Sequence, residues 1–285
     1  MKPTTLARIA EIADELFPLN LAEAWDNCGI QIGDPDHLIG SVAFSLDPTP
    51  QTVKFAHENS CQLLVTHHPV LLEPVLKILP DSLSGKTLLA AASMGVDIMS
   101  LHTNLDAAPG GLNDSLAAAL GLKDVVTPLP ARCARMGLLL TPTRVTVLAE
   151  RLAADLGIRG VRIVAETDRA VQRVFCASGS GMGYLRDALE QGAELILTGD
   201  VKYHTAREAV EMGLAVIDAG HYGLERFAIQ IMSDSFKAEF EREGLEIGCV
   251  ACDTEQDPFL EILDRRGGLS IERATETSRA TSGNR

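Results

Sequence analysis

Apolar residues recur at two spacings along the chain, and these spacings predict alternating helices and strands. Near the N-terminus, Leu6, Ile9, Ala13 and Phe17 fall on one helical face, which predicts an amphipathic helix that ends before Pro18. Further along, short apolar runs bounded by turn residues predict strands. Strands that alternate with helices of about ten residues favour right-handed crossovers and a mostly parallel sheet. The predicted fold class is α/β.

Both halves of the chain follow this alternation. In the first half we expect strands at 28–33, 41–46, 62–66 and 96–101, with helices at 50–59, 85–93 and 112–120. In the second half we expect strands at 136–140, 161–165, 171–177, 194–198, 215–217 and 245–250, with helices at 143–156, 182–191, 203–212, 223–240 and, briefly, near 258–264. The chain therefore has enough elements for two α/β lobes.

A change of composition marks the predicted boundary between the lobes. Residues 123–135 form a connector rich in proline and basic residues. The connector separates an N-terminal lobe, 1–122, from a C-terminal lobe, 136–264. The tail, 265–285, is polar and rich in Ser, Thr, Arg and Glu, so we expect it to be disordered.

The two halves repeat one pattern that carries candidate metal ligands. In the first copy, an apolar strand leads to His102, with Asp106 four residues later. In the second copy, an apolar strand leads to His221, with Glu225 four residues later. Each strand is entered through Met-Gly. This repeat predicts two pseudo-symmetric lobes that arose by internal duplication, with mixed, mostly parallel sheets.

Two further strands end in polar side chains. The strand at 62–66 ends in His67-His68, and the strand at 194–198 ends in Gly199-Asp200. Open α/β sheets place their ligands at the carboxyl ends of parallel strands. Four strand ends therefore present His, Asp and Glu in a pseudo-symmetric arrangement, from which a two-metal site can be built.

Each part of this arrangement also has a plainer interpretation. Adjacent histidines on an extended backbone diverge, so His67 and His68 suit either two ions or a surface turn before a proline. His221 and Glu225 share one face of a predicted helix, as ligands would, but a first-turn glutamate is also favoured by the helix dipole. Asp106 falls in a predicted loop, so its direction cannot be read from periodicity. The repeat connects these positions and makes coincidence the poorer explanation.

Composition narrows the class of protein. Hydrophobic residues make up 46% of the chain and charged residues 22%, as in ordinary soluble proteins. No apolar run is long enough to span a bilayer, and the N-terminus lacks a signal-peptide core, which predicts a cytoplasmic protein without a membrane partner. The net charge of −14 disfavours sequence-independent nucleic-acid binding.

Three other features have less predictive value. The glycine-rich turn at 179–183 follows a strand and precedes a helix, which suits either a weak anion site or a tight turn. Trp25-Asp26-Asn27 contains the only tryptophan, and we expect Asp26 or Asn27 to cap or support a neighbouring group. Cys249 and Cys252 form a lone CxxC, which predicts reduced, structural cysteines. A triad nucleophile is disfavoured because the sequence has no Gly-x-Ser-x-Gly elbow.

Five sequence blocks resemble those of the GTP cyclohydrolase 1 type 2 homologues, a dinuclear-metal family also described as Ngg-interacting-factor-like. The blocks are LAEAWDNCGI at 21–30, THHP at 66–69, HTNLD at 102–106, TGDVKYH at 198–204 and GHYGLE at 220–225. The resemblance covers most of the chain. It departs at Cys28, where a small aliphatic residue is commoner in the family.

The resemblance implies a specific ligand set and assembly. It implies that the chain binds two divalent cations through His67, His68, Asp106, His221 and Glu225. Glu225 would bridge the two ions. Imidazole and carboxylate suit zinc, iron, manganese, cobalt or nickel. The family also implies a toroidal homohexamer with its metal sites facing an internal cavity. The short span 123–171 implies the form without a large inserted domain.

These expectations lead to three functional hypotheses. The first is a metal-dependent hydrolase in which a water bridging the ions attacks an unidentified small molecule, either nucleotide-like or a cyclic amide. His102 and Asp200 would then be candidate catalytic residues, in proton transfer or in supporting the ligands. The second is a non-enzymatic protein for metal storage, delivery or regulation. The third, nucleic-acid binding within the ring, is weakened by the charge. GTP cyclohydrolase activity itself is implied only by the family name.

Overall fold

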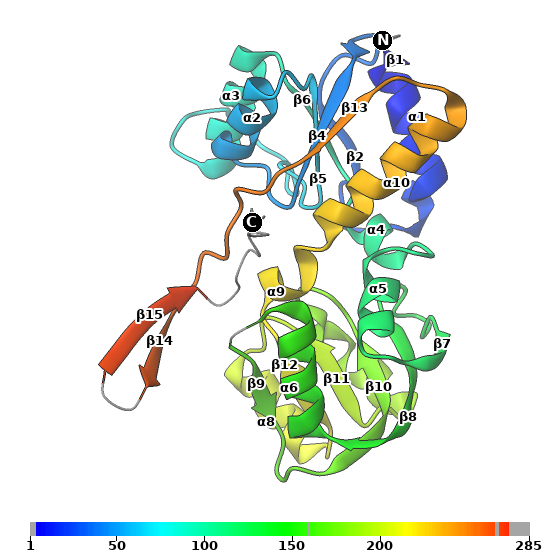
Figure 1. The fold of residues 1–285 in the computed structure, drawn as a ribbon, viewed down its shortest axis with the longest axis vertical. Helices are drawn as coiled ribbons and strands as arrows, with labels where there is room; N and C mark the ends of the chain where they lie inside the picture. The colour runs from blue at the N-terminus through cyan, green and yellow to red at the C-terminus, as the bar shows by residue number, and fades with distance from the viewer. Residues whose placement is uncertain (1–3, 159, 266–267, 274–285) are drawn as a thin grey trace, which may run out of the picture. The chain divides into compact units, whose positions relative to one another are not determined.

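The chain folds into two α/β units, each built around a mixed sheet (Figure 1). The computed structural model describes residues 4–158, 160–265 and 268–273. The first unit contains residues up to 115 together with 225–255, and the second contains 116–224 together with the described residues from 256 onward. The predicted α/β class with mixed sheets is therefore confirmed.

The first unit contains a five-stranded sheet. Its strands lie in the order β13 (Gly248–Ala251), β4 (Ser41–Ser45), β5 (Leu63–Thr66), β6 (Asp97–Ser100) and β2 (Gly29–Ile32). The first four strands run parallel, and β2 pairs antiparallel with β6. Every side chain of β5 and β6 is buried, as expected for strands covered on both faces. The parallel direction brings the carboxyl ends of β4, β5 and β6 to one edge.

Four helices cover the two faces of this sheet. Helices α1 (Leu6–Leu16) and α10 (Ala228–Glu243) pack together on one face, and α2 (Pro50–Glu58) and α3 (Leu83–Met94) pack together on the other (Figure 1). The shorter elements that complete the described part of this unit are β1 (Thr4–Thr5), η1 (Leu19–Leu21), β3 (Leu38–Ile39) and α4 (Thr103–Ala107). The helices cover the faces of the sheet, and the loops lie at its carboxyl edge.

Local sequence explains where these helices start. The hydroxyl of Thr5 accepts a hydrogen bond from the Arg8 N–H, which caps the first turn of α1. In α2, Pro50 occupies the first turn, where its missing N–H costs nothing, and Thr49 and Thr52 form a reciprocal capping box. Both starts lie within two residues of the positions predicted from the sequence.

The second unit contains a six-stranded sheet. Its strands lie in the order β7 (Lys123–Val126), β8 (Arg135–Arg144), β10 (Ala170–Cys176), β11 (Leu195–Thr198), β12 (Ala215–Asp218) and β9 (Arg162–Val164). β10, β11 and β12 run parallel, whereas β8 and β9 are antiparallel to their neighbours β10 and β12. The two units therefore share a pattern of one antiparallel and three parallel strands. In the first, β2 precedes β4, β5 and β6 along the chain and pairs antiparallel with β6; in the second, β9 precedes β10, β11 and β12 and pairs antiparallel with β12.

Helices cover this sheet as well. Helix α6 (Val145–Leu156) contacts β8, β9 and β12, and Figure 1 draws it in front of the sheet. The apolar side chains of η2 (Gly181–Tyr184), α7 (Leu185–Glu190) and α8 (Tyr203–Glu211) share a core with Phe175 and Ile196 of the sheet. Two short helices, α5 (Leu112–Ala119) and α9 (His221–Glu225), contain the points at which the chain passes from one unit to the other. No described helix is long and apolar enough to cross a membrane.

The division into units differs from the division predicted at 123–135. The predicted C-terminal lobe, 136–264, includes α10 and β13, but both complete the first unit. β13 pairs with β4 so that Cys249 lies opposite Val42, and Phe236 of α10 packs against Phe44, with ring centroids 5.4 Å apart. The predicted connector itself contains β7 and the first residue of β8. Composition along the chain does not reveal which sheet a returning strand joins.

The C-terminal region also differs from its prediction. The short helix predicted near 258–264 is instead the strand β14 (Leu260–Arg265), which forms an antiparallel hairpin with β15 (Gly268–Arg273). Apolar residues stand two positions apart in each strand, at Leu260 and Ile262 and again at Leu269 and Ile271, which is a strand pattern. The tail predicted to be disordered, 265–285, therefore begins within this hairpin. Its residues 266–267 and 274–285 lie outside the described residues.

Replacing Leu64 with Ala will destabilise the first unit. Leu64 lies in β5, is fully buried and belongs to an apolar cluster between the sheet and α2 and α3. A cavity at such a site costs about 2–5 kcal/mol in the free energy of unfolding. Leu76→Ala is the matched control, because Leu76 is 98% exposed. Urea denaturation followed by circular dichroism compares the two, and equal midpoints would contradict this packing.

Candidate metal centre

Polar residues follow the three central parallel strands of the first unit at one edge of its sheet. Asp47 comes after β4, His67 and His68 directly follow β5, and His102 comes after β6. The sheet hydrogen bonding continues beyond the strand ends: the N–H of His67 donates to the Ser45 carbonyl at 3.1 Å. The backbone of these residues is therefore positioned by the sheet.

His67 lies at the bottom of the site and is completely buried. Its Nδ1–H donates to the Leu101 carbonyl at 2.8 Å, so Nε2 is the unprotonated nitrogen of the neutral ring. Among the described residues, this Nε2 has no hydrogen-bond partner. The nearest carboxylate oxygens, from Asp106 and Glu225, are both 3.9 Å away. Burial opposes protonation of the ring, but Glu225 and Asp106 outweigh it and raise the pKa of His67. The space between this nitrogen and the two carboxylates therefore suits a positive charge, either a proton or a metal ion.

His68 lies between two carboxylates. Its Nδ1 is 2.8 Å from Oδ1 of Asp47, and its Nε2 is 3.0 Å from Oε2 of Glu225. Burial opposes protonation of the ring, but hydrogen bonds and charge from Asp47 and Glu225 outweigh it and raise the pKa of His68 to about 10. At neutral pH, without a metal ion, the imidazolium therefore donates one hydrogen bond to each carboxylate.

His102 is oriented by Asp26. Its Nδ1–H donates to Oδ1 of Asp26 at 2.9 Å, and the Thr103 N–H, the Thr103 hydroxyl and the Cys28 thiol all donate to Oδ2. Burial works to raise the pKa of Asp26, but the hydrogen bonds from His102 and Thr103 outweigh it and hold the pKa well below its usual range. Asp26 is therefore ionised, and Nε2 remains the available ligand atom of His102.

The three histidines come together. The ring centroid of His102 is 5.2 Å from that of His67 and 5.5 Å from that of His68, and one ring nitrogen from each lies within 4.8 Å of the others. Two carboxylates complete the group. Asp106 lies on α4, where the sequence predicted a loop, and its side chain is 10% exposed. Glu225 is 4% exposed, and its Oε2 lies near both His67 and His68.

The second unit contains two of the sequence candidates, Asp200 and His221. Oδ2 of Asp200 accepts a hydrogen bond from the Nδ1–H of His221 at 2.7 Å. Asp200 follows β11 in the left-handed region, at φ +54°, which is uncommon for a residue other than glycine. His221 is the first residue of α9 and lies one helical turn before Glu225 along that helix. Asp200, a candidate catalytic residue in the sequence analysis, thus orients His221.

All four histidines share one arrangement. In each case an acceptor engages Nδ1, which directs Nε2 away as a potential ligand atom. The acceptors are the Leu101 carbonyl and the carboxylates of Asp47, Asp26 and Asp200. Metal-binding histidines commonly donate their second ring N–H to a carboxylate or carbonyl. Within the first unit, the ring nitrogens of His67, His68 and His102 together with the nearby carboxylates fit a divalent first-row metal ion.

Sequence reasoning did not identify Asp47 and left the role of Asp26 general. A usable signal existed for Asp47, because it directly follows the predicted strand 41–46, as His67 follows 62–66. Asp26 lies in an irregular loop, and its pairing with His102, 76 residues later, leaves no periodic signal. The expectation that Asp26 supports a neighbouring group agrees with its contacts.

The remaining sequence candidates have structural explanations. The turn at 179–183 is a packing turn: the Gly181 N–H donates to the Thr198 hydroxyl at 2.7 Å, and a Cβ at Gly181 would lie 2.5 Å from that of Ala177. Cys249 and Cys252 are free thiols, and burial raises the pKa of Cys249 to about 11. Three carboxylates that approach one another on α1 and α10 are neutralised by arginines, as in the 2.6 Å pair between Arg8 and Glu243.

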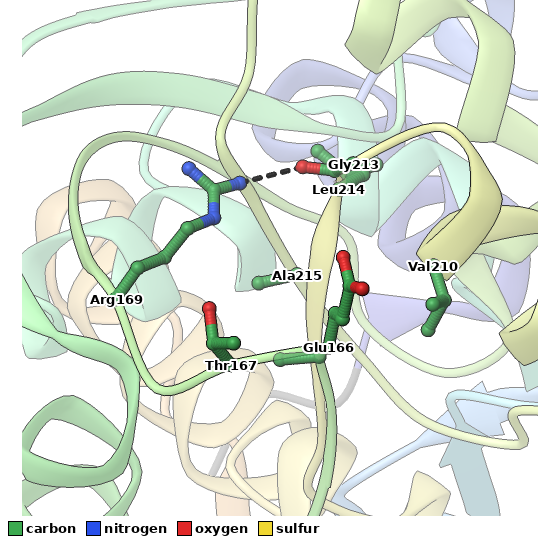
Figure 2. Close-up of a pocket in the computed structure, with 8 residues that line it drawn as sticks. Glu166, Thr167, Arg169, Val210, Gly213, Leu214 and Ala215 are labelled. Carbon is green, nitrogen blue, oxygen red and sulfur yellow. Dashed lines mark hydrogen bonds between the residues drawn. The ribbon is translucent and has the colours of Figure 1, made fainter.

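A cavity of about 250 Å³ lies elsewhere in the second unit (Figure 2). It is lined by Glu166, Arg169, Val210 and the first residue of β12, Ala215, at the end of the strand opposite to His221. The Arg169 guanidinium donates to the Gly213 carbonyl at 2.7 Å, the contact dashed in Figure 2, and also to that of Glu194. The hydrogen bonds of Arg169 thus join the loop before β11 to the loop before β12.

Comparison with known proteins identifies the family of this chain. The family model of Duf34/NIF3 (NGG1p interacting factor 3) matches residues 4–258. A GTP cyclohydrolase 1 type 2 homolog of Clostridium perfringens is 31% identical over 258 residues, 88% of this chain and 97% of that protein. A NIF3 homolog of Schizosaccharomyces pombe is 25% identical, over 90% of this chain and 98% of that protein.

A solved structure has the same fold. A hypothetical protein of Staphylococcus aureus superposes with a TM-score of 0.84 at 26% identity, covering 91% of this chain and 100% of that one. The resemblance that the five sequence blocks indicated is thereby confirmed over nearly the whole chain. The protein therefore belongs to the Duf34/NIF3 family.

Proposed function

We propose that this protein binds two divalent cations and uses them to hydrolyse a small molecule. The observation that supports this most strongly is the buried Nε2 of His67, which lies 3.9 Å from two carboxylates and lacks a partner among the described residues. A cation between that nitrogen and the two carboxylates would bind all three groups.

The proposed ligands divide into two groups around Glu225. His67 and Asp106 face Glu225 from the buried side, and His68 reaches the same Oε2 of Glu225 from the more exposed side. His221 would join through α9, which presents it one turn before Glu225. A carboxylate that serves both groups suits the role of a bridge between two ions.

A bound divalent ion supplies Lewis acidity and makes water a nucleophile at neutral pH. The protein residues would supply the proton transfer. Asp26 holds a proton on Nδ1 of His102, which leaves Nε2 as a base beside the centre. We assign His102 this role, and we assign Asp200 the role of orienting His221. The proposed substrate is a nucleotide-like or cyclic amide compound. The relatives' name gives no further reason to choose GTP.

We also propose an internal duplication and a ring-shaped homohexamer. The same order of one antiparallel and three parallel strands in each unit supports the duplication. Family membership is the basis for the ring, and light scattering would measure its mass directly.

The metal content is the first test. Elemental analysis of the purified protein should find about two divalent ions per chain, and His67→Ala should lose at least one, because it removes the buried ligand atom. His57→Ala is the matched control: His57 is exposed, and its Nδ1 bonds the Met94 carbonyl far from the centre in the fold. A His67→Ala protein with unchanged metal content would exclude His67 as a ligand.

Proton release on metal binding is the second test. The pKa of His68 is raised to about 10, so its proton stabilises the metal-free protein fully below about pH 6.5, and this stabilisation disappears as the pH rises through 10. A metal ion at Nε2 must displace that proton. We expect roughly one proton released from His68 at pH 8 and an affinity that rises with pH.

Calorimetry in buffers of different ionisation enthalpy counts these protons. Competition should begin well above the pH of about 6 that an unperturbed histidine would give. Asp47→Asn should lower the pKa of His68 and reduce the release, because it removes one of the two carboxylates. Metal binding without proton release at pH 8 would show that Nε2 of His68 is not a ligand.

A metal-handling protein is the second candidate function. The imidazolium of His68 between Asp47 and Glu225 favours it, because protons that compete for a site also promote release of its ion. Turnover separates the two functions. A hydrolase should convert members of a panel of nucleosides, phosphoesters and cyclic amides, and Glu225→Gln should abolish this with the fold intact. A metal-loaded protein that is inactive across the panel but exchanges ions rapidly with a chelator would instead be a carrier.

A further inference from the structure

Trp25 is a large aromatic side chain held in solvent. It is 60% exposed and is the only tryptophan of the chain. Exposing an indole forgoes a substantial part of the stabilisation that its burial would give. Exposed aromatic rings beside polar clusters are typical of binding sites.

The backbone around Trp25 is fixed. The Asp26 N–H donates to the Glu23 carbonyl at 3.0 Å, which closes a turn with Trp25 near its tip. Thr103 then clamps both ends of the turn: its hydroxyl accepts from the Glu23 N–H at 3.0 Å, and its own N–H donates to the Asp26 carboxylate at 3.0 Å. These bonds fix the backbone position from which the indole of Trp25 extends.

The exposed indole adjoins the histidine cluster. The ring centroids of Trp25 and His102 are 6.0 Å apart with the planes at 76°, an edge contact that leaves indole surface uncovered. His102 in turn contacts the rings of His67 and His68. A ring that stacked on Trp25 would therefore lie beside the proposed metal centre.

We propose that Trp25 is a stacking platform for a planar, electron-poor nitrogen heterocycle of nucleobase size. The face of an indole is electron-rich, so a flat heteroaromatic ring complements it in shape and in charge distribution. A saturated ring of the same size offers neither. This assignment rests on the proposed function, because it makes the heterocycle the part of the substrate that is held next to the centre.

A second copy of the chain is the competing occupant of this surface. Asn27 joins the turn to another loop by donating to the Leu71 carbonyl at 2.6 Å, and Leu72 and Leu76 of that loop are exposed. The ring that contacts Trp25, however, is the imidazole of His102, and the exposed, polar Asn27 lies two residues along the chain. Polar groups around one aromatic ring suit an oriented small molecule better than an apolar protein interface.

Tryptophan fluorescence tests the proposal directly, because every signal comes from Trp25. The probe is inosine, titrated into the full-length, metal-loaded protein. We expect saturable quenching by inosine. Uridine and 5,6-dihydrouridine form a matched pair that differs in ring planarity, and uridine should bind more tightly. The absence of saturable inosine binding, or equal binding of the pair, would overturn the proposal.

Two variants separate stacking from simple apolarity. By calorimetry, Trp25→Phe should bind inosine within a few-fold of the original protein, whereas Trp25→Leu should bind roughly tenfold more weakly or worse. Equal binding of inosine by Trp25→Leu would refute the platform. A change in the mass of the Trp25→Leu protein by light scattering would also refute it, because the indole would then belong to an interface with a second copy of the chain. Metal content measured on the same samples tests the centre separately: metal-loaded protein that ignores inosine refutes only the platform.

Discussion

The buried imidazole of His67 is the constraint on which the candidate site depends. The Leu101 carbonyl fixes the proton on Nδ1, and Nε2 is buried without a hydrogen-bond partner among the described residues. A nitrogen lone pair in this position destabilises the fold unless a cation or a proton reaches it. The carboxylates of Asp106 and Glu225 face the same space. Two negative charges and a nitrogen lone pair at close range favour a cation between them.

The parallel sheet explains why these groups meet. Three neighbouring strands end at one edge of the first sheet, and each end leads to a carboxylate or an imidazole that engages a partner from another segment. Asp47 orients His68, and Asp26 orients His102. The same device recurs in the second unit, where Asp200 orients His221. The proposed metal centre thus relies on carboxylates that orient imidazoles, as well as on the imidazoles themselves.

Much of this could be predicted from sequence. Short apolar runs located the central strands within one or two residues, and polar residues at their carboxyl ends located His67 and His68. Asp106, a candidate from the sequence, lies 3.9 Å from Nε2 of His67, but its helix was missed because five residues are too few to show a period. The return of α10 and β13 to the first unit and the pairing of Asp26 with His102 are long-range contacts, which leave no local pattern.

The most direct measurement is anomalous diffraction from crystals of the protein loaded with zinc. The account predicts an anomalous peak about 2.0–2.1 Å from Nε2 of His67, with Asp106 and Glu225 drawn in from 3.9 Å to coordinate the same ion. A second peak should lie at the same coordination distance from Nε2 of His68. A structure in which Nε2 of His67 bonds instead to a protein group or an ordered water, with no peak beside it, would contradict the account at its centre.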